Sequence, residues 1–298
     1  MDVPNQRKLN TVVIPTLGGV GIFIGVNIST LIFLPDIKLT ELRFLYAAII
    51  MMFFIGLEDD LLVISARKKF LVQVAASFLL VVMGDFQITH AYGLFGINEF
   101  PTWFGIPLTV LIFLFLINAI NLIDGIDGLA AGIGVLICSV TGLWFYGVGA
   151  LGYAIISTAV AASLLAFMRF NLFSDKNKIF MGDTGSLILG VILGVIAITF
   201  NELNASVAQP FHFNHAPLMV IGLLIVPVTD TIRVFAIRIY HKKSPFSPDT
   251  NHIHHLLIKA GLPHLAASCL LFGYTIFFTM LALTLPLYVD ITTGFVLL

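Results

Sequence analysis

The segment Ile106-Pro-Leu-Thr-Val-Leu-Ile-Phe-Leu-Phe-Leu-Ile-Asn-Ala-Ile-Asn-Leu-Ile-Asp-Gly-Ile-Asp-Gly128 joins an apolar run to evenly spaced polar residues. The run 106–117 has no charged residue, as is typical of a helix in lipid. Polar residues then recur at every third position, at Asn118, Asn121, Asp124 and Asp127. If the helix continues, their side chains lie on one slowly drifting face. A carboxylate at mid-membrane costs about 2.5–3.5 kcal/mol even on mild insertion scales. The pattern therefore favours a functional site over a helix that ends in water with polar caps.

The composition of the whole chain is that of a membrane protein. Of its 298 residues, 59% are hydrophobic and only 10% are charged, whereas soluble domains carry about 25% charged residues. The formal net charge of −1 gives no indication of a nucleic-acid partner. We therefore expect an all-α polytopic membrane protein, organised as a single transmembrane domain over residues 1–298.

Apolar runs of spanning length predict nine complete transmembrane helices and a partial last one. The expected spans are 14–34, 42–57, 69–84, 105–123, 128–147, 151–170, 184–200, 216–238 and 265–285, with a fragment at 287–298.

Basic residues predict the orientation of these spans. If the segment before residue 14 is cytoplasmic, 13 of the 15 Lys and Arg residues lie in or beside inside loops. The outer loops 86–104 and 201–215 contain neither Lys nor Arg, and their histidines are expected to be polar surface. Every dense polar cluster then lies on the cytoplasmic face. A secondary transporter is expected to place such residues near the midplane. One polar face suits an enzyme that joins a water-soluble substrate to a lipid.

Three further clusters have both a structural and a functional interpretation. Asp59-Asp60 is either a solvated turn or a site for a divalent metal or a general base. Gly182-Asp-Thr-Gly-Ser186 is either an ordinary helix start or a helix N-terminus that faces phosphate, with Asp183 on a metal ion. His252-Ile-His-His255 lacks the spacing of helical zinc sites and favours either a solvated loop or a donor-rich pocket for diphosphate.

Acidic residues on several loops, with basic residues between them, are the groups that phosphoryl transfer requires. The chain has no Gly-Lys-Ser/Thr P-loop, so the sequence does not indicate ATP hydrolysis by that route.

Together these motifs resemble those of bacterial polyprenyl-phosphate N-acetylhexosamine-1-phosphate transferases, relatives of the phospho-MurNAc-pentapeptide translocase. The matching segments are Asp2–Lys8 with Pro15–Gly19, Asp59-Asp60 with Lys69–Gln73, Asn118–Gly128, Phe180–Ser186, Pro227–Arg233 and His252–His255. The resemblance implies transfer of a sugar-1-phosphate from a UDP-N-acetylhexosamine to undecaprenyl phosphate, with release of UMP. It further implies Mg²⁺ or Mn²⁺ as cofactor, a multi-pass place in the bacterial cytoplasmic membrane, a role in cell-envelope polysaccharide synthesis and a possible homodimer.

The resemblance also assigns roles to individual residues. It implies that Asp59, Asp60 and Asp183 are catalytic and that Asp183 and Asp60 hold the metal. The implied substrate-binding residues are Lys8, Lys69, Asn121, Asp124, Asp127, Asn171, Phe180, Arg233, His252, His254 and His255. An Asp either deprotonates the lipid phosphate for direct attack, which we favour, or forms a covalent intermediate.

The loop around His252 suggests a branch within this family. The His-Ile-His-His form, preceded by Ser244–Asp249, resembles the branch that uses UDP-N-acetylglucosamine. The peptidoglycan branch, which transfers phospho-MurNAc-pentapeptide, is the alternative, and a cation-coupled transporter is the alternative from another class. The chain begins at the Asp2–Lys8 motif without the helix that usually precedes it, so we expect that the family's first helix is absent. Asn10 stands where the family often has His.

Overall fold

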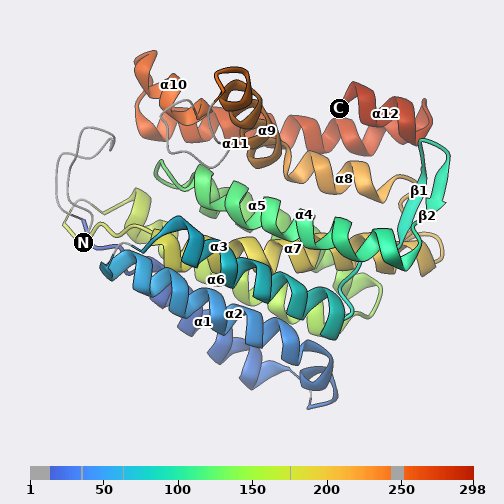
Figure 1. The fold of residues 1–298 in the computed structure, drawn as a ribbon, viewed down its shortest axis with the longest axis horizontal. Coiled ribbons are helices and arrows are strands. Elements are labelled where there is room, and N and C mark those ends of the chain that lie inside the picture. Colours follow the sequence, from blue (N-terminus) through green and yellow to red (C-terminus); the bar gives the residue numbers. More distant parts are fainter. Residues whose placement is uncertain (1–13, 35, 63, 175, 243–251) are drawn as a thin grey trace.

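The computed structural model describes residues 14–34, 36–62, 64–174, 176–242 and 252–298. These residues form a helical bundle with one small hairpin (Figure 1). The first elements are α1 (Gly18–Phe33), α2 (Asp36–Leu62), α3 (Ala66–Phe78) with a π-helical end (Leu79–Met83), β1 (His90–Leu94) and β2 (Ile97–Glu99). The long helices α4 (Thr102–Ile123), α5 (Leu129–Gly147), α6 (Leu151–Leu172) and α7 (Gly182–Ser206) follow. The last are α8 (Ala216–Leu223), α9 (Ile225–Tyr240), α10 (Ile253–Lys259), α11 (His264–Thr284), a 3₁₀ turn (Leu285–Leu287) and α12 (Ile291–Leu297).

Helix α7 is the central element of the bundle. It is apolar between its first and last turns and almost fully buried, as expected of a helix with neighbours on all sides. Helices α1, α2, α4 and α5 pack around it (Figure 1). The position of α7 makes its first turn the natural meeting point for residues at the ends of the surrounding helices.

Gly56 allows α2 to approach α7 unusually closely. A Cβ atom at this position would lie 2.5 Å from the Cα of Thr184, so no larger residue fits there without a shift of backbone. The contact lies about one helical turn before Asp59 and Asp60. It therefore carries these two carboxylates to the N-terminal end of α7.

The structure bears out a polytopic membrane protein but not the count of nine spans. Among the described residues, five helices are long and apolar enough to cross a membrane, and α8 with α9 would make a sixth. That pair is bent by 75° at Leu224, so the expected span 216–238 is broken. Helix α1, with 16 residues, is a shorter apolar helix, and α3 ends after 13 residues in a π-helical segment.

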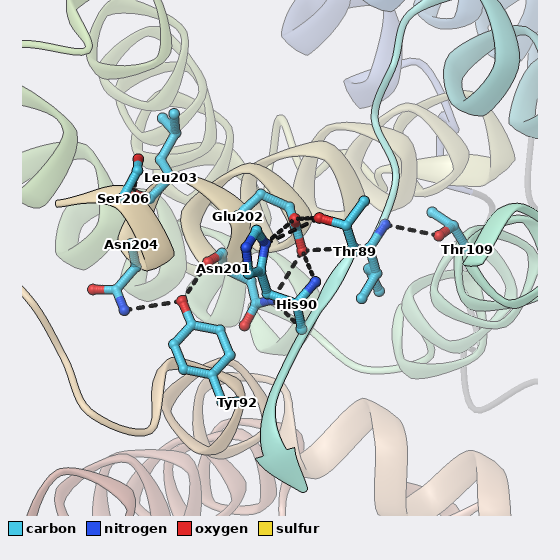
Figure 2. Close-up of polar contacts among 10 residues, drawn as sticks. Thr89, His90, Tyr92, Thr109, Asn201, Glu202, Leu203, Asn204 and Ser206 are labelled. Carbon is cyan, nitrogen blue, oxygen red and sulfur yellow. Dashed lines mark hydrogen bonds and ion pairs between the residues drawn. The ribbon is translucent and has the colours of Figure 1, made fainter. Parts of the chain in front are cut away.

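The expectation of an all-helical chain misses the antiparallel hairpin β1–β2, which lies at the end of the bundle far from α10 (Figure 1). Glu202, near the end of α7, holds this hairpin (Figure 2). Its carboxylate accepts hydrogen bonds from the backbone N–H groups of Thr89 at 3.0 Å and His90 at 3.3 Å. The Thr89 hydroxyl and the His90 ring, at 2.9 Å, contact its other oxygen. His90 is thus part of a structural contact rather than simple polar surface.

Candidate active site

Asp60 binds the first turn of α7 from the end of α2. Its Oδ1 accepts a hydrogen bond from the backbone N–H of Asp183 at 2.9 Å. Its Oδ2 accepts from the Thr184 N–H at 2.9 Å and from the Thr184 hydroxyl at 2.6 Å. The first N–H groups of a helix have no partner within the helix, and the helix dipole stabilises negative charge there. Asp60 therefore caps α7 and fixes the position of Asp183.

Asp59 faces a different set of partners, which centre on Lys69. The Lys69 ammonium lies 3.2 Å from Asp59 Oδ2 and 3.0 Å from Asp183 Oδ1. Burial, followed by the neighbouring Asp183 carboxylate, raises the pKa of Asp59 to about 6. Asn121 donates hydrogen bonds to Asp183 and, at 2.8 Å, to the hydroxyl of Ser186. Residues from α2, α3, α4 and α7 thus meet at one carboxylate, Asp183.

The turn between α4 and α5 contributes two more carboxylates. Burial raises the pKa of Asp124 well above its ordinary value, and the negative charges of Asp183, Asp60 and Asp127 raise it further. Asp127 forms an ion pair with Lys178 at 2.6 Å. Burial and mutual repulsion therefore favour the neutral form of Asp124, while Lys178 balances the charge of Asp127.

Asn171 holds this turn against the chain that leads into α7. Its side chain accepts a hydrogen bond from the Gly128 N–H at 2.7 Å and donates one to the Ile179 carbonyl at 2.9 Å. It is buried, with 4% of its surface exposed. Asn171 is placed to position the turn beside Phe180, which is half-buried.

The histidine cluster packs against the same turn from α10. His252 contacts Asp230 Oδ2 through Nδ1 at 2.8 Å, and Arg233 forms an ion pair with the other oxygen of Asp230 at 2.7 Å. His254 is buried against Gly125, where a Cβ atom would meet its Nε2 at 2.3 Å. Burial, followed by the neighbouring histidines, lowers the pKa of His254 to about 3, so the ring is neutral at physiological pH.

The donor chemistry of this region fits a divalent cation such as Mg²⁺. Carboxylate oxygens are the ligands that Mg²⁺ prefers, and it commonly uses one or two of them together with substrate phosphates. The close contact of Asp59 with Asp183 is a repulsion that a bound cation would offset. In the described part of the chain, no three His, Cys, Asp or Glu side chains form a ready-made metal group.

The structure brings together most residues that the sequence singled out, and it adds others. Lys8 lies outside the described residues. The side chains of His252 and His254 are buried, so a contact of the histidines with substrate phosphate stays a prediction. Three contacts were missed: Lys178 and His264 near Asp127 Oδ2, at 2.6 and 3.7 Å, and the Ser268 hydroxyl, which donates to the Asp127 carbonyl at 2.6 Å. Lys178 lies two residues before the Phe180 motif, a signal that could have identified it.

Comparisons with known proteins agree with the resemblance seen in the sequence. The family model for glycosyl transferase family 4 matches residues 42–201. A probable undecaprenyl-phosphate N-acetylglucosaminyl 1-phosphate transferase from Bacillus subtilis (strain 168) is 32% identical over 291 residues, which cover 96% of this chain and 77% of that protein. An undecaprenyl-phosphate alpha-N-acetylglucosaminyl 1-phosphate transferase from Yersinia pestis is 30% identical, with coverage of 88% and 70%. A decaprenyl-phosphate N-acetylglucosaminephosphotransferase from Mycolicibacterium smegmatis (strain ATCC 700084 / mc(2)155) is 33% identical, with coverage of 90% and 71%.

Proposed function

The chain belongs to glycosyl transferase family 4, and on that premise we propose that it transfers N-acetylglucosamine-1-phosphate from UDP-N-acetylglucosamine to undecaprenyl phosphate. The observation that carries the proposal is the convergence of Asp59, Asp60, Lys69, Asn121 and Asp183 at the first turn of α7. These are the groups that position phosphates and stabilise charge during phosphoryl transfer. The relatives' names supply the transferred group, N-acetylglucosamine-1-phosphate, and the lipid, while UDP as its carrier follows from the resemblance seen in the sequence.

In the proposed reaction, an oxygen of the lipid phosphate attacks the phosphorus that carries the sugar. The phosphoanhydride bond breaks, UMP leaves, and a lipid-linked sugar diphosphate forms. Asp59 is the residue best placed to orient or deprotonate the lipid phosphate, because its Oδ2 is bound by a side chain rather than by the backbone. Lys69 stabilises the charge that develops on the phosphate oxygens. We favour this direct attack over a covalent intermediate.

Asp60 has a different part in this proposal from the one that the sequence suggested. Both of its oxygens are engaged by the backbone or side chain of the first α7 turn, so it acts by positioning Asp183. We propose Asp183 and Asp59, in place of Asp183 and Asp60, as the side chains that would hold Mg²⁺. When bound, the ion would neutralise charge on the diphosphate oxygens.

The nucleotide is proposed to lie beside the α4–α5 turn. Asp124, Asp127 and Phe180 border this region, and Asn171 holds the two segments together. Phe180 is proposed to stack on uracil, and the Lys178 ammonium, 5.7 Å from the ring centroid, would then lie near the nucleotide. By the positive-inside pattern, this face is proposed to be cytoplasmic, in the inner membrane of a bacterium.

The test is UMP release by purified protein with undecaprenyl phosphate, Mg²⁺ and one donor at a time. We expect lipid-dependent UMP from UDP-N-acetylglucosamine. Release only from UDP-MurNAc-pentapeptide would move the chain to the peptidoglycan reaction. No release from any donor, in protein whose melting shows that it is folded, would contradict the proposal.

A further inference from the structure

Gln73 lies one turn deeper in the bundle than Lys69. The residues Lys69, Gln73 and Ser77 are spaced by four along α3 and therefore share one face of that helix. Gln73 is 1% exposed, while Leu71, on another face of α3, is exposed. Burial of an amide in an apolar bundle costs free energy unless the amide is hydrogen-bonded. A glutamine at this position therefore calls for a partner.

The partner of Gln73 is Asn118 of α4. The Asn118 Nδ2 group donates to Gln73 Oε1 at 2.9 Å and to the Leu114 carbonyl of its own helix at 2.7 Å. Asn118 lies three residues before Asn121, so the two amides are neighbours on α4. The contact between Gln73 and Asn118 connects α3 to α4 just beneath the residues that reach Asp183.

This contact closes a triangle of polar interactions among three helices. Lys69 attaches α3 to α7 through Asp183, at 3.0 Å. Asn121 attaches α4 to α7 through Asp183 and Ser186. The third side, between α3 and α4, is the Gln73–Asn118 hydrogen bond. With all three sides present, the two groups that contact Asp183 are fixed relative to each other.

We propose that Gln73 and Asn118 are a pair of positioning residues that hold Lys69 and Asn121 in register around Asp183. The inference rests on the proposed function, because its consequence is a faster transfer step. Neither residue touches the reacting groups in this arrangement. Displacement of a catalytic group by about 1 Å can reduce a rate by about 100-fold. The pair is therefore expected to affect kcat more than the binding of the donor.

The test compares wild type with Gln73→Leu, Asn118→Leu and the double variant in the UMP-release assay. We expect each single variant to lower kcat by about 10- to 100-fold, with the KM for UDP-N-acetylglucosamine changed by less than about threefold. Because the pair acts as one unit, the double variant should be no slower than the slower single variant. Gln73→Glu keeps an oxygen that can accept from Asn118, and it should restore most of kcat.

Ser77→Ala is the matched control. Ser77 is buried on the same face of α3, one turn deeper, and its hydroxyl has no hydrogen-bond partner among the described residues. We expect wild-type kcat from this variant. Melting temperatures of all variants in detergent distinguish a loss of folded protein from a loss of rate.

The possible outcomes separate this inference from the proposed function. An inactive wild type would overturn both. With an active wild type, normal kcat in Gln73→Leu would overturn the inference alone, as would effects that add in the double variant. Equal loss in Gln73→Glu and Gln73→Leu, or a loss of kcat that merely follows the melting temperature, would also overturn it.

Discussion

Replacement of Asp60 by Asn should destabilise the start of α7 and disturb Asp183. The carboxylate accepts three hydrogen bonds, one through Oδ1 and two through Oδ2. An Asn side chain has one acceptor oxygen, which would turn toward the two donors of Thr184. Its NH₂ group would then face the N–H of Asp183, where neither group can accept. The variant therefore loses one hydrogen bond, a charge and the support of the Asp183 backbone.

The expected cost follows from these changes. A hydrogen bond to a charged group contributes about 1.5–3 kcal/mol. Negative charge at a helix N-terminus adds about 0.3–1 kcal/mol. Together they predict a loss of about 2–4 kcal/mol, which lowers the melting temperature by roughly 4–16 °C if the chain responds as soluble domains of 150–250 residues do. A shift of Asp183 by about 1 Å would reduce kcat by about 100-fold as well.

Two variants separate the capping role of Asp60 from a catalytic one. Thr184→Val removes only the hydroxyl donor, at 2.6 Å from Asp60, and, because the acceptor is charged, should cost about 1.5–3 kcal/mol without the loss of charge at the helix start. Asp59→Asn should abolish most UMP release with a much smaller effect on melting, because a single backbone N–H, that of Ile64, donates to this carboxylate at 2.9 Å. An Asp60→Asn protein that melts like wild type while losing activity would refute the reasoning.

Other predictions concern Asp183, His254 and Glu202. Asp183→Asn should remove most UMP release and raise the Mg²⁺ concentration required for activity, and a chelator should abolish the activity of wild type. Turnover that does not depend on Mg²⁺ in either protein would exclude this role for Asp183. Burial lowers the pKa of native His254 to about 3, whereas the ring in the unfolded chain has its ordinary pKa of 6.5. Below pH 6.5 the unfolded chain therefore binds a proton that the native ring does not bind. The contribution of neutral His254 to stability is lost as the pH falls from 6.5. Melting of His254→Asn between pH 6.5 and about 5 should therefore depend less on pH than melting of wild type, and equal slopes would contradict the assignment. Glu202→Gln should lower the melting temperature by weakening the hairpin contact, yet leave the KM for the donor unchanged, because the two sites lie at opposite ends of the bundle (Figures 1 and 2).

The sequence predicts the composition of the site better than it predicts the shape of the bundle. Carboxylates, amides and basic residues at the ends of apolar runs are readable because polar groups in such places are costly. The break at Leu224 is harder to predict, although Gly222 and Pro227 flank it. Both residues lie inside a continuous apolar run, and the local backbone hydrogen bonds continue through the bend, from Leu224 to Val220 and from Val228 to Leu224, so no local pattern indicates it. The hairpin is missed for a similar reason, since Glu202 that holds it is more than 100 residues away.

The different roles of Asp59 and Asp60 show where sequence reasoning ends. Adjacent residues on a helix point about 100° apart, so the sequence implies that the two carboxylates cannot share all their partners. The sequence does not indicate which of the two carboxylates contacts α7, because this contact depends on the approach of α2 at Gly56 and on the direction of the α7 axis. Once Asp60 is committed to the N–H groups of α7, the carboxylate beside Lys69 is Asp59. The different roles of Asp59 and Asp60 are therefore a consequence of helix packing. An exchange of these roles would require α2 to rotate about its axis, which the close contact at Gly56 opposes.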